Sequence, residues 1–220
     1  MLNKLVIIIA LLMPVASTAC SNGAEKAQPA TTVQSTDSAS IPVRVAQQLP
    51  PLPDKATGTA FIVISKRDQL VSVYDRDTAG DTVLVAQFPC CMGKNKGNKQ
   101  RRGDMRTPES PSGKPFKITM IQDASTWKHD FKDGRGNILA YGHWFLRLET
   151  PGHSGIGIHG STNNEHTVPG RASEGCIRLL DKDIITLKEH FAYVGMPVTV
   201  QPEDQAPYPW EERARHANKQ

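Results

Sequence analysis

Residues 155–161 of the chain are Gly-Ile-Gly-Ile-His-Gly-Ser, and residues 172–179 are Ala-Ser-Glu-Gly-Cys-Ile-Arg-Leu. The first stretch indicates a short apolar strand that ends in a histidine, and the second holds a cysteine next to a glycine. A cysteine nucleophile needs a base to remove its proton and donors to stabilise the oxyanion that forms. Histidine suits the role of base near neutral pH. Taken alone, the cysteine is more typical of a buried structural thiol, and the histidine is compatible with an ordinary strand-end residue.

One pattern runs through both stretches: His159-Gly160, a polar loop, and Ser173-Glu-Gly-Cys-Ile-Arg178. This pattern resembles the motif of the L,D-transpeptidase catalytic (YkuD-type) family of bacterial cell-wall enzymes. A softer match lies upstream, where Gly93, a basic loop, Thr107-Pro108 and residues 113–116 are similar to the family's Thr-Pro-x-Gly-x-Phe segment, with residues 109–112 as an insertion. The resemblance covers about residues 57–201. It implies a mainly β, β-sandwich-like catalytic domain over residues 57–202.

The resemblance also implies a role for each residue of the motif. Cys176 is the expected nucleophile and His159 the expected base, with the backbone carbonyl of Gly160 orienting the imidazole. Gly175 lets a substrate carbonyl approach closely, and N–H groups around Cys176 are the expected oxyanion donors. The two remaining motif residues are expected to act around the cysteine, Ser173 by supporting its loop and Arg178 by ordering the site or binding a substrate carboxylate.

Three other histidines lie near the motif in the sequence: His143, His153 and His166. None has a partner at the close His or Cys spacing that is typical of zinc sites, so we expect neither a metal nor another cofactor. We expect His143 to line the substrate cleft or to pack in the sheet. His166 lies between the catalytic residues, where a lid is one interpretation.

Substrates of the family are peptidoglycan stem peptides. The resemblance implies that Cys176 attacks the carbonyl of the third stem residue, expels the terminal D-Ala and forms a thioester. An amine of a neighbouring stem would resolve the thioester into a cross-link, whereas water would make the enzyme an L,D-carboxypeptidase. A non-catalytic wall-binding module is the third possibility, and the intact motif argues against it.

The residues around the motif indicate a mostly β domain. Short β-branched and aromatic runs at residues 61–64, 70–74 and 83–88, separated by turn-forming residues, predict an antiparallel meander. Residues 116–121, 138–148, 155–158 and 197–200 continue the β character. One clear helix is expected over residues 181–194, with Asp181 as its cap and Gly195 at its end. Residues 203–220 form a polar C-terminal tail, either docked or frayed.

The N-terminus predicts export. Residues 1–19 contain one lysine, a twelve-residue apolar run and small residues, which is the layout of a signal peptide. Cys20 follows directly, as in bacterial lipoprotein signals, so we expect a lipidated Cys20; plain cleavage before a free thiol is the alternative. Residues 20–56 are rich in Ala, Thr, Ser, Gln and Pro and indicate a flexible linker. The expected location is the bacterial envelope, in the periplasm, with the protein held on a membrane by its lipid.

The composition limits the partners. The net charge of +4 over 220 residues makes a nucleic-acid binder improbable, and export excludes one. Four cysteines are too few to staple a domain of this size, and we expect Cys90 and Cys91 to be unpaired thiols, at least one of them buried. The basic run at residues 94–106 is either a solvated loop or a contact for anionic wall polymer. We expect a monomer.

Overall fold

The computed structural model describes residues 49–219. The expected signal peptide over residues 1–19, the expected lipidation of Cys20 and the expected linker up to residue 48 lie outside the described residues. None of the helices formed by residues 49–219 is long and apolar enough to cross a membrane.

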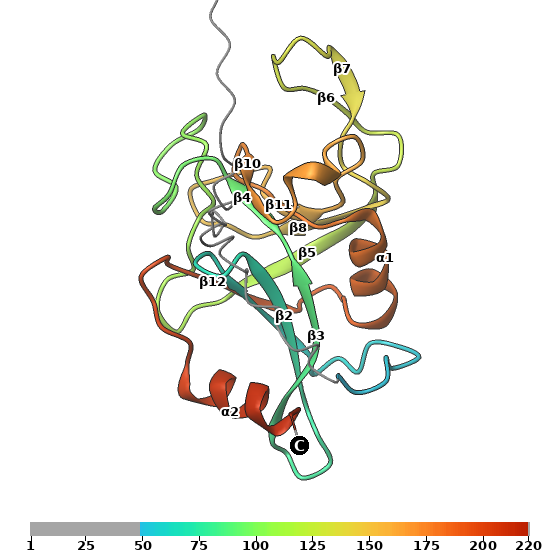
Figure 1. The fold of residues 1–220 in the computed structure, drawn as a ribbon, viewed down its shortest axis with the longest axis vertical. Helices are drawn as coiled ribbons and strands as arrows, with labels where there is room; N and C mark the ends of the chain where they lie inside the picture. Colours follow the sequence, from blue (N-terminus) through green and yellow to red (C-terminus); the bar gives the residue numbers. More distant parts are fainter. Residues whose placement is uncertain (1–48, 220) are drawn as a thin grey trace, which may run out of the picture. The chain divides into compact units, whose positions relative to one another are not determined.

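Strands are the main regular structure of the described chain, which also contains two α-helices and one 3₁₀ helix (Figure 1). The elements in chain order are β1 (Phe61–Ser65), β2 (Leu70–Arg76), β3 (Thr82–Pro89), β4 (Cys91–Gly93), β5 (Phe116–Asp123), β6 (Lys128–Asp130), β7 (Asn137–Leu139), β8 (Trp144–Leu148), β9 (Gly157–His159), η1 (Glu165–Thr167), β10 (Gly170–Ser173), β11 (Ile177–Arg178), α1 (Asp181–His190), β12 (Pro197–Gln201) and α2 (Pro209–Ala217).

Ten of these strands form one mixed sheet in the order β10-β4-β11-β9-β8-β5-β12-β1-β2-β3. The predicted meander is confirmed, because β1, β2 and β3 pair antiparallel in sequence order. The strand expected over residues 138–148 is split into β7 and β8 by a turn. Strand β7 pairs with β6 in a separate hairpin, which stands away from the rest of the sheet in Figure 1.

Both halves of the sheet, which meet at β5, contribute to one apolar core. Ile62 and Val73 come from the meander half, whereas Leu146, Ile158 and Ile177 come from the half that carries the cysteine motif, and all are fully buried or nearly so. β-Branched and long aliphatic side chains on facing strands pack in this way because each strand presents alternate residues to one face. The predicted mainly β, sandwich-like domain is therefore confirmed.

The one α-helix expected in the domain is present as α1, and the C-terminal tail contains a further helix, α2, that the sequence did not predict. Trp210 packs edge-on against Tyr74 and Phe61, with ring centroids 5.1 and 5.4 Å away. Ala214 is buried one turn further along the helix. The carboxylate of Glu211 accepts the Tyr208 N–H at 2.7 Å, which stabilises the first turn. The sequence signal was weak because the buried residues of α2 are Glu211 and Ala214, and Trp210 is half-buried.

Helix α1 is also shorter than expected. It ends at His190, and the Ala192 N–H donates back to the Leu187 carbonyl at 2.8 Å. The chain then turns toward β12, so that Val194, the last residue of the expected helix, is 64% exposed. Gly195 adopts a left-handed φ of 94° in this turn, beyond the helix rather than at its end.

A buried lysine ties the meander to the loops beside the motif. Lys66 is 1% exposed, and its ammonium donates to the Glu109 carboxylate at 2.6 Å and to the Gly97 carbonyl at 2.8 Å. Glu203 lies 3.4 Å from the same ammonium and accepts from Arg171 at 2.8 Å. These contacts link β1, the basic loop, β10 and the start of the C-terminal segment.

Replacing Lys66 by methionine is expected to lower the free energy of unfolding by about 3–5 kcal/mol, since two carboxylates would lose a buried partner. Urea unfolding measures this change. Lys117→Met, at an exposed position on β5, is the matched control and should change stability by less than about 0.5 kcal/mol. A loss below about 1 kcal/mol in Lys66→Met would contradict the importance of this network.

Candidate active site

The register of four strands brings the motif residues onto one face of the sheet. His159 on β9 pairs with Phe145 on β8 and with Arg178 on β11, and Arg178 pairs with Cys91 on β4. Side chains at paired positions of neighbouring strands lie on the same face. Cys176 precedes β11 and lies two residues from Arg178, so it belongs to this face as well.

A pocket opens at this face, between the sheet and the β6–β7 hairpin. Its lining residues are His129, Phe131, Tyr141, Gly155, Ile156, His159, Ser173, Glu174, Cys176 and Arg178. The structure thus places four of the predicted site residues, Cys176, His159, Ser173 and Arg178, around one pocket. A larger groove lies between the β2–β3 hairpin and α2, and neither cysteine nor histidine lines it.

His159 is held as a neutral imidazole in one tautomer. Its Nδ1 lies 2.6 Å from the Gly160 carbonyl, which can only accept, so Nδ1 carries the hydrogen and Nε2 keeps a free lone pair. The ring is 3% exposed and stacks on Phe145 at a centroid distance of 5.6 Å. Burial lowers the pKa of His159 to about 3, and the positive charge of Arg178 acts in the same direction.

Gly160 has no room for a side chain. A Cβ at this position would lie 2.3 Å from Asp181 Oδ1 and 2.7 Å from the Cα of Gly142. Asp181 was expected to cap α1, but its carboxylate instead accepts the Ser161 N–H at 2.8 Å and the Thr162 hydroxyl. The first residue of α1 therefore fixes the turn that carries His159.

The turn before Cys176 is shaped by Ser173 and Gly175. The Ser173 hydroxyl donates to the Cys176 carbonyl at 2.6 Å and accepts the Gly175 N–H at 3.1 Å. Gly175 has a φ of 139°, and a Cβ there would lie 2.8 Å from the Arg106 carbonyl. Both the backbone conformation and the close contact require glycine. Because its N–H is occupied, Gly175 shapes the loop and leaves oxyanion binding to other donors.

The Cys176 thiol is partly exposed at the floor of the pocket. Its sulfur donates to the Gly155 carbonyl at 3.4 Å and accepts the Gly157 N–H. Burial raises the pKa of Cys176, while the Gly157 N–H and the charges of Arg178 and Lys99 oppose the rise. The resting site is therefore a neutral thiol beside a neutral imidazole.

The β6–β7 hairpin supplies residues that sequence reasoning missed. The ring of Phe131 lies under the Arg178 guanidinium, with the Arg178 Cζ 4.9 Å from the ring centroid. His129 Nε2 lies 3.3 Å from the Glu174 carboxylate across the pocket. Tyr141 follows the hairpin and its ring centroid is 4.9 Å from that of His159. The available signal was the alternation of rings at residues 127, 129 and 131, which is typical of one face of a strand.

Arg178 is buried beneath this hairpin at 3% exposure, and its Nε has no hydrogen-bond partner among the described residues. A buried guanidinium with a free donor is suited to an anionic group that enters from the pocket. A second pocket adjoins the first across Phe131, Glu174 and Arg178, and Lys94 and Arg135 lie on its far side.

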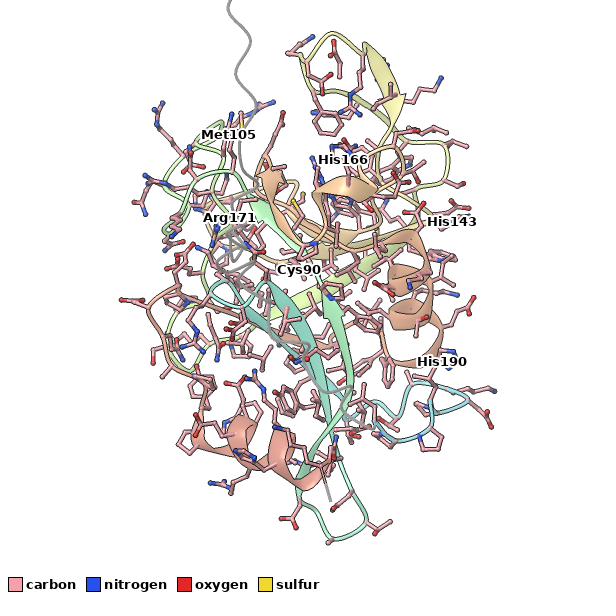
Figure 2. The ribbon with its side chains drawn as sticks, in the orientation of Figure 1. Cys90, Met105, His143, His166, Arg171 and His190 are labelled. Carbon is pink, nitrogen blue, oxygen red and sulfur yellow. The ribbon has the colours of Figure 1, made fainter. Side chains whose placement is uncertain are left out.

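The prediction that His143 lines the substrate cleft is wrong. The chain turns sharply at Gly142, whose φ is 68°, so that Tyr141 faces the pocket and His143 is exposed outside it, beside α1 (Figure 2). Its backbone carbonyl accepts the Ala124 N–H at 2.9 Å. His166, in η1, lines the adjoining pocket and does not line the pocket of Cys176.

Cys90 and Cys91 are free thiols and both are fully buried, as expected for at least one of them. Cys90 belongs to the apolar core, where burial raises the pKa of its thiol. Within residues 49–219, no three His, Cys, Asp or Glu side chains gather in a cluster that would suit a metal ion.

Comparison with known proteins identifies the domain. A family model of the L,D-transpeptidase catalytic domain, YkuD, matches residues 59–200, which include the complete cysteine motif and the upstream Thr107-Pro108 segment. The chain belongs to this family. The family predicted from the sequence is thus confirmed. No curated protein sequence matches the chain.

Several solved structures are similar to this L,D-transpeptidase domain, each at 18% identity. Bd1075 from Bdellovibrio bacteriovorus has a TM-score of 0.48 and the match covers 78% of this chain and 60% of that one. An L,D-transpeptidase from Mycobacterium smegmatis has a TM-score of 0.45, with coverages of 64% and 58%. The helical cell shape determining protein Pgp2 from Campylobacter jejuni has a TM-score of 0.47, with coverages of 77% and 55%. The chain thus spans less than two thirds of the length of these structures.

The buried His159 of this L,D-transpeptidase domain predicts acid sensitivity. Its pKa falls from about 6.5 in the unfolded chain to about 3 in the folded one, so below pH 6.5 the unfolded state binds more protons. The contribution of the neutral His159 imidazole to the free energy of unfolding is fully present above pH 6.5 and decreases as the pH falls toward 3. Between pH 6.5 and 4.5 the wild type should lose about 2–3 kcal/mol more than His159→Gln, as measured by urea unfolding. Equal losses in both proteins would contradict a neutral, buried imidazole.

Proposed function

We propose that the protein is a peptidoglycan L,D-transpeptidase that uses Cys176 as nucleophile and His159 as general base. One observation carries the proposal: the Cys176 thiol and the His159 ring share a pocket, and the Gly160 carbonyl leaves Nε2 of His159 as the free lone pair. Membership in the family supports the substrate class, the stem peptides of the cell wall.

The first half of the reaction is acylation. As the sulfur of Cys176 bonds to the carbonyl carbon of the third stem residue, its proton passes to His159 Nε2. Backbone N–H groups at Cys176 stabilise the oxyanion. The carbon–nitrogen bond to the terminal D-Ala then breaks, and the departing amine takes the proton from His159. The product is a thioester on Cys176 and free D-Ala.

The second half transfers the acyl group to an amine. His159 Nε2 removes a proton from an amine of a neighbouring stem, the nitrogen attacks the thioester carbonyl, and the proton returns to the Cys176 sulfur as it leaves. Arg178 supports this assignment, since it lines the pocket and its positive charge suits a stem carboxylate. The adjoining pocket on the other side of Phe131 gives a second peptide room to approach.

The substrate also supports the location expected from the sequence. Peptidoglycan lies outside the cytoplasmic membrane, so the enzyme needs the export signal expected over residues 1–19. A lipid on Cys20 would hold the domain at a membrane surface, and the polar linker that follows would give it reach. We therefore propose a lipid-anchored enzyme of the periplasm that acts as a monomer.

Mass analysis of muropeptides tests the proposal. Purified protein is incubated with cell wall whose stems are tetrapeptides, with Cys176→Ala in parallel. Cross-linked dimers that have lost one D-Ala support a transpeptidase. Tripeptide monomers alone mean that water is the acceptor and that the enzyme is an L,D-carboxypeptidase. Wall that stays unchanged with the wild type contradicts both and leaves a binding module.

A further inference from the structure

The basic loop at residues 94–106 contains one lysine that solvent barely reaches. Lys99 is 7% exposed, and its ammonium donates to Asp104 Oδ1 at 2.9 Å and to the Arg106 carbonyl at 3.4 Å. The neighbouring Lys94 and Lys96 are exposed. A buried ammonium loses its hydration and is retained where its charge is paired. Lys99 is therefore a buried, ion-paired lysine, whereas Lys94 and Lys96 are solvated.

Asp104 fixes the ion pair in place. Its carboxylate accepts the backbone N–H groups of Gln100, Arg101 and Arg106, at 2.7, 3.1 and 3.1 Å. Burial would raise the pKa of Asp104, but these donors together with Lys99 hold it well below its usual range. The loop is thus held by hydrogen bonds to the carboxylate of Asp104, and the ammonium of Lys99 has a defined position.

That position is directly behind the cysteine turn. A Cβ on Gly175 would lie 3.4 Å from Lys99 Nζ and 2.8 Å from the Arg106 carbonyl. The ammonium of Lys99 thus lies close to the residue that precedes Cys176. Met105, labelled in Figure 2, lies in this loop.

A second contact reaches the other side of the sulfur. The Lys99 carbonyl lies 3.2 Å from His153 Nε2, and since a carbonyl only accepts, Nε2 is the donor. His153 begins the segment whose Gly155 carbonyl and Gly157 N–H contact the Cys176 sulfur. One residue of the basic loop therefore lies beside the cysteine turn and contacts the segment on the other side of the sulfur.

We infer that Lys99 is a positioning residue for Cys176: held by Asp104, its buried ammonium supports the Gly175–Cys176 turn and favours the thiolate over the thiol. The inference rests on the proposed role of Cys176 as nucleophile and assigns the basic loop to the site rather than to the wall polymer. The thiol pKa agrees, since Lys99 and Arg178 both lower it.

Other charged and titratable groups also surround the thiol, and the test must separate Lys99 from them. Those groups are Arg178 on β11, Glu174 in the cysteine turn, Tyr141 before β8, His159 on β9 and His129 on β6. None of them lies on the basic loop. Substitutions confined to the loop therefore leave all of them in place.

The experiment measures the rate at which iodoacetamide alkylates Cys176 in the full chain between pH 6 and 10, with the labelled peptide quantified by mass spectrometry. Lys99→Met is expected to move the midpoint of the profile about 0.5–1 unit higher, which slows alkylation at pH 8 by about 3–10-fold. Lys99→Arg should restore the midpoint. Lys96→Met removes the same charge from an exposed position of the loop and should leave the profile unchanged.

Asp104→Asn separates electrostatics from simple loosening of the loop. It keeps one of the two oxygens, so that the Gln100 and Arg101 N–H groups retain an acceptor, and it removes the negative charge. The midpoint should therefore move lower, opposite to Lys99→Met. The inference would be overturned if the midpoint moved in the same direction in both variants, or if it did not move in Lys99→Met. If Lys99→Met does not fold, the direction of the shift in Asp104→Asn decides the question. Alkylation needs no wall substrate, so a failure here is distinct from a failure of the proposed transpeptidation.

Discussion

Replacing Cys176 by alanine is expected to abolish D-Ala release from tetrapeptide stems, with a fall of about 10⁴-fold or more, because no other group can form the thioester. The thiol is partly exposed and makes only one weak hydrogen bond as a donor, to Gly155. The melting temperature should therefore change by no more than a few degrees. Chromatographic quantification of released D-Ala measures the activity, and calorimetry measures the stability.

Cys90→Ala is the matched control for this variant, since it removes a thiol that is buried in the core and does not line the pocket. It should keep the activity within a few-fold of wild type while it loses some stability. Full activity in Cys176→Ala, or an equal loss of activity in both variants, would contradict the assignment of the nucleophile.

Replacing His159 by glutamine is expected to lower kcat/KM at pH 7 by about 10²–10⁴-fold, the usual contribution of a general base. The loss should diminish as the pH rises, since above the thiol pKa no base is needed to generate the thiolate. Initial rates between pH 6 and 10 measure the effect. In the wild type, the activity should not fall between pH 7 and 5 through protonation of His159, because the pKa of its imidazole is about 3.

His143→Gln is the control for the histidine variant. His143 lies outside the pocket, so the same substitution there should leave kcat/KM within about two-fold of wild type (Figure 2). A large loss in His143→Gln would restore the expectation from the sequence that this residue meets the substrate. An undiminished rate in His159→Gln would contradict the assignment of the base.

The residues of the motif lie together in the structure because their contacts are local. Ser173, Gly175 and Cys176 lie within four residues, and their hydrogen bonds are made within the same turn. His159-Gly160 is likewise self-contained, since the carbonyl of one residue fixes the ring of the other. Short-range contacts of this kind follow directly from residue order.

The surroundings of the site depend on contacts that are distant in sequence. Lys99 meets the cysteine turn across more than seventy positions, and Phe131 reaches Arg178 from a hairpin that folds back over the sheet. His143 and Tyr141 could not be distinguished by pattern, because the turn at Gly142 decides which of the two faces the pocket. Helix α2 was missed because its buried stripe is small, and it is stabilised by aromatic contacts with β1 and β2.

The most direct test of the account is to capture the acyl-enzyme. Wild-type protein is mixed with a soluble tetrapeptide stem without an amine acceptor, quenched in acid, and analysed by intact mass and peptide mapping. Thioester catalysis predicts an adduct with the mass of the stem minus its terminal D-Ala, located on Cys176 and labile to hydroxylamine. An adduct on another residue, or D-Ala release with no covalent species under single-turnover conditions, would contradict thioester catalysis by Cys176.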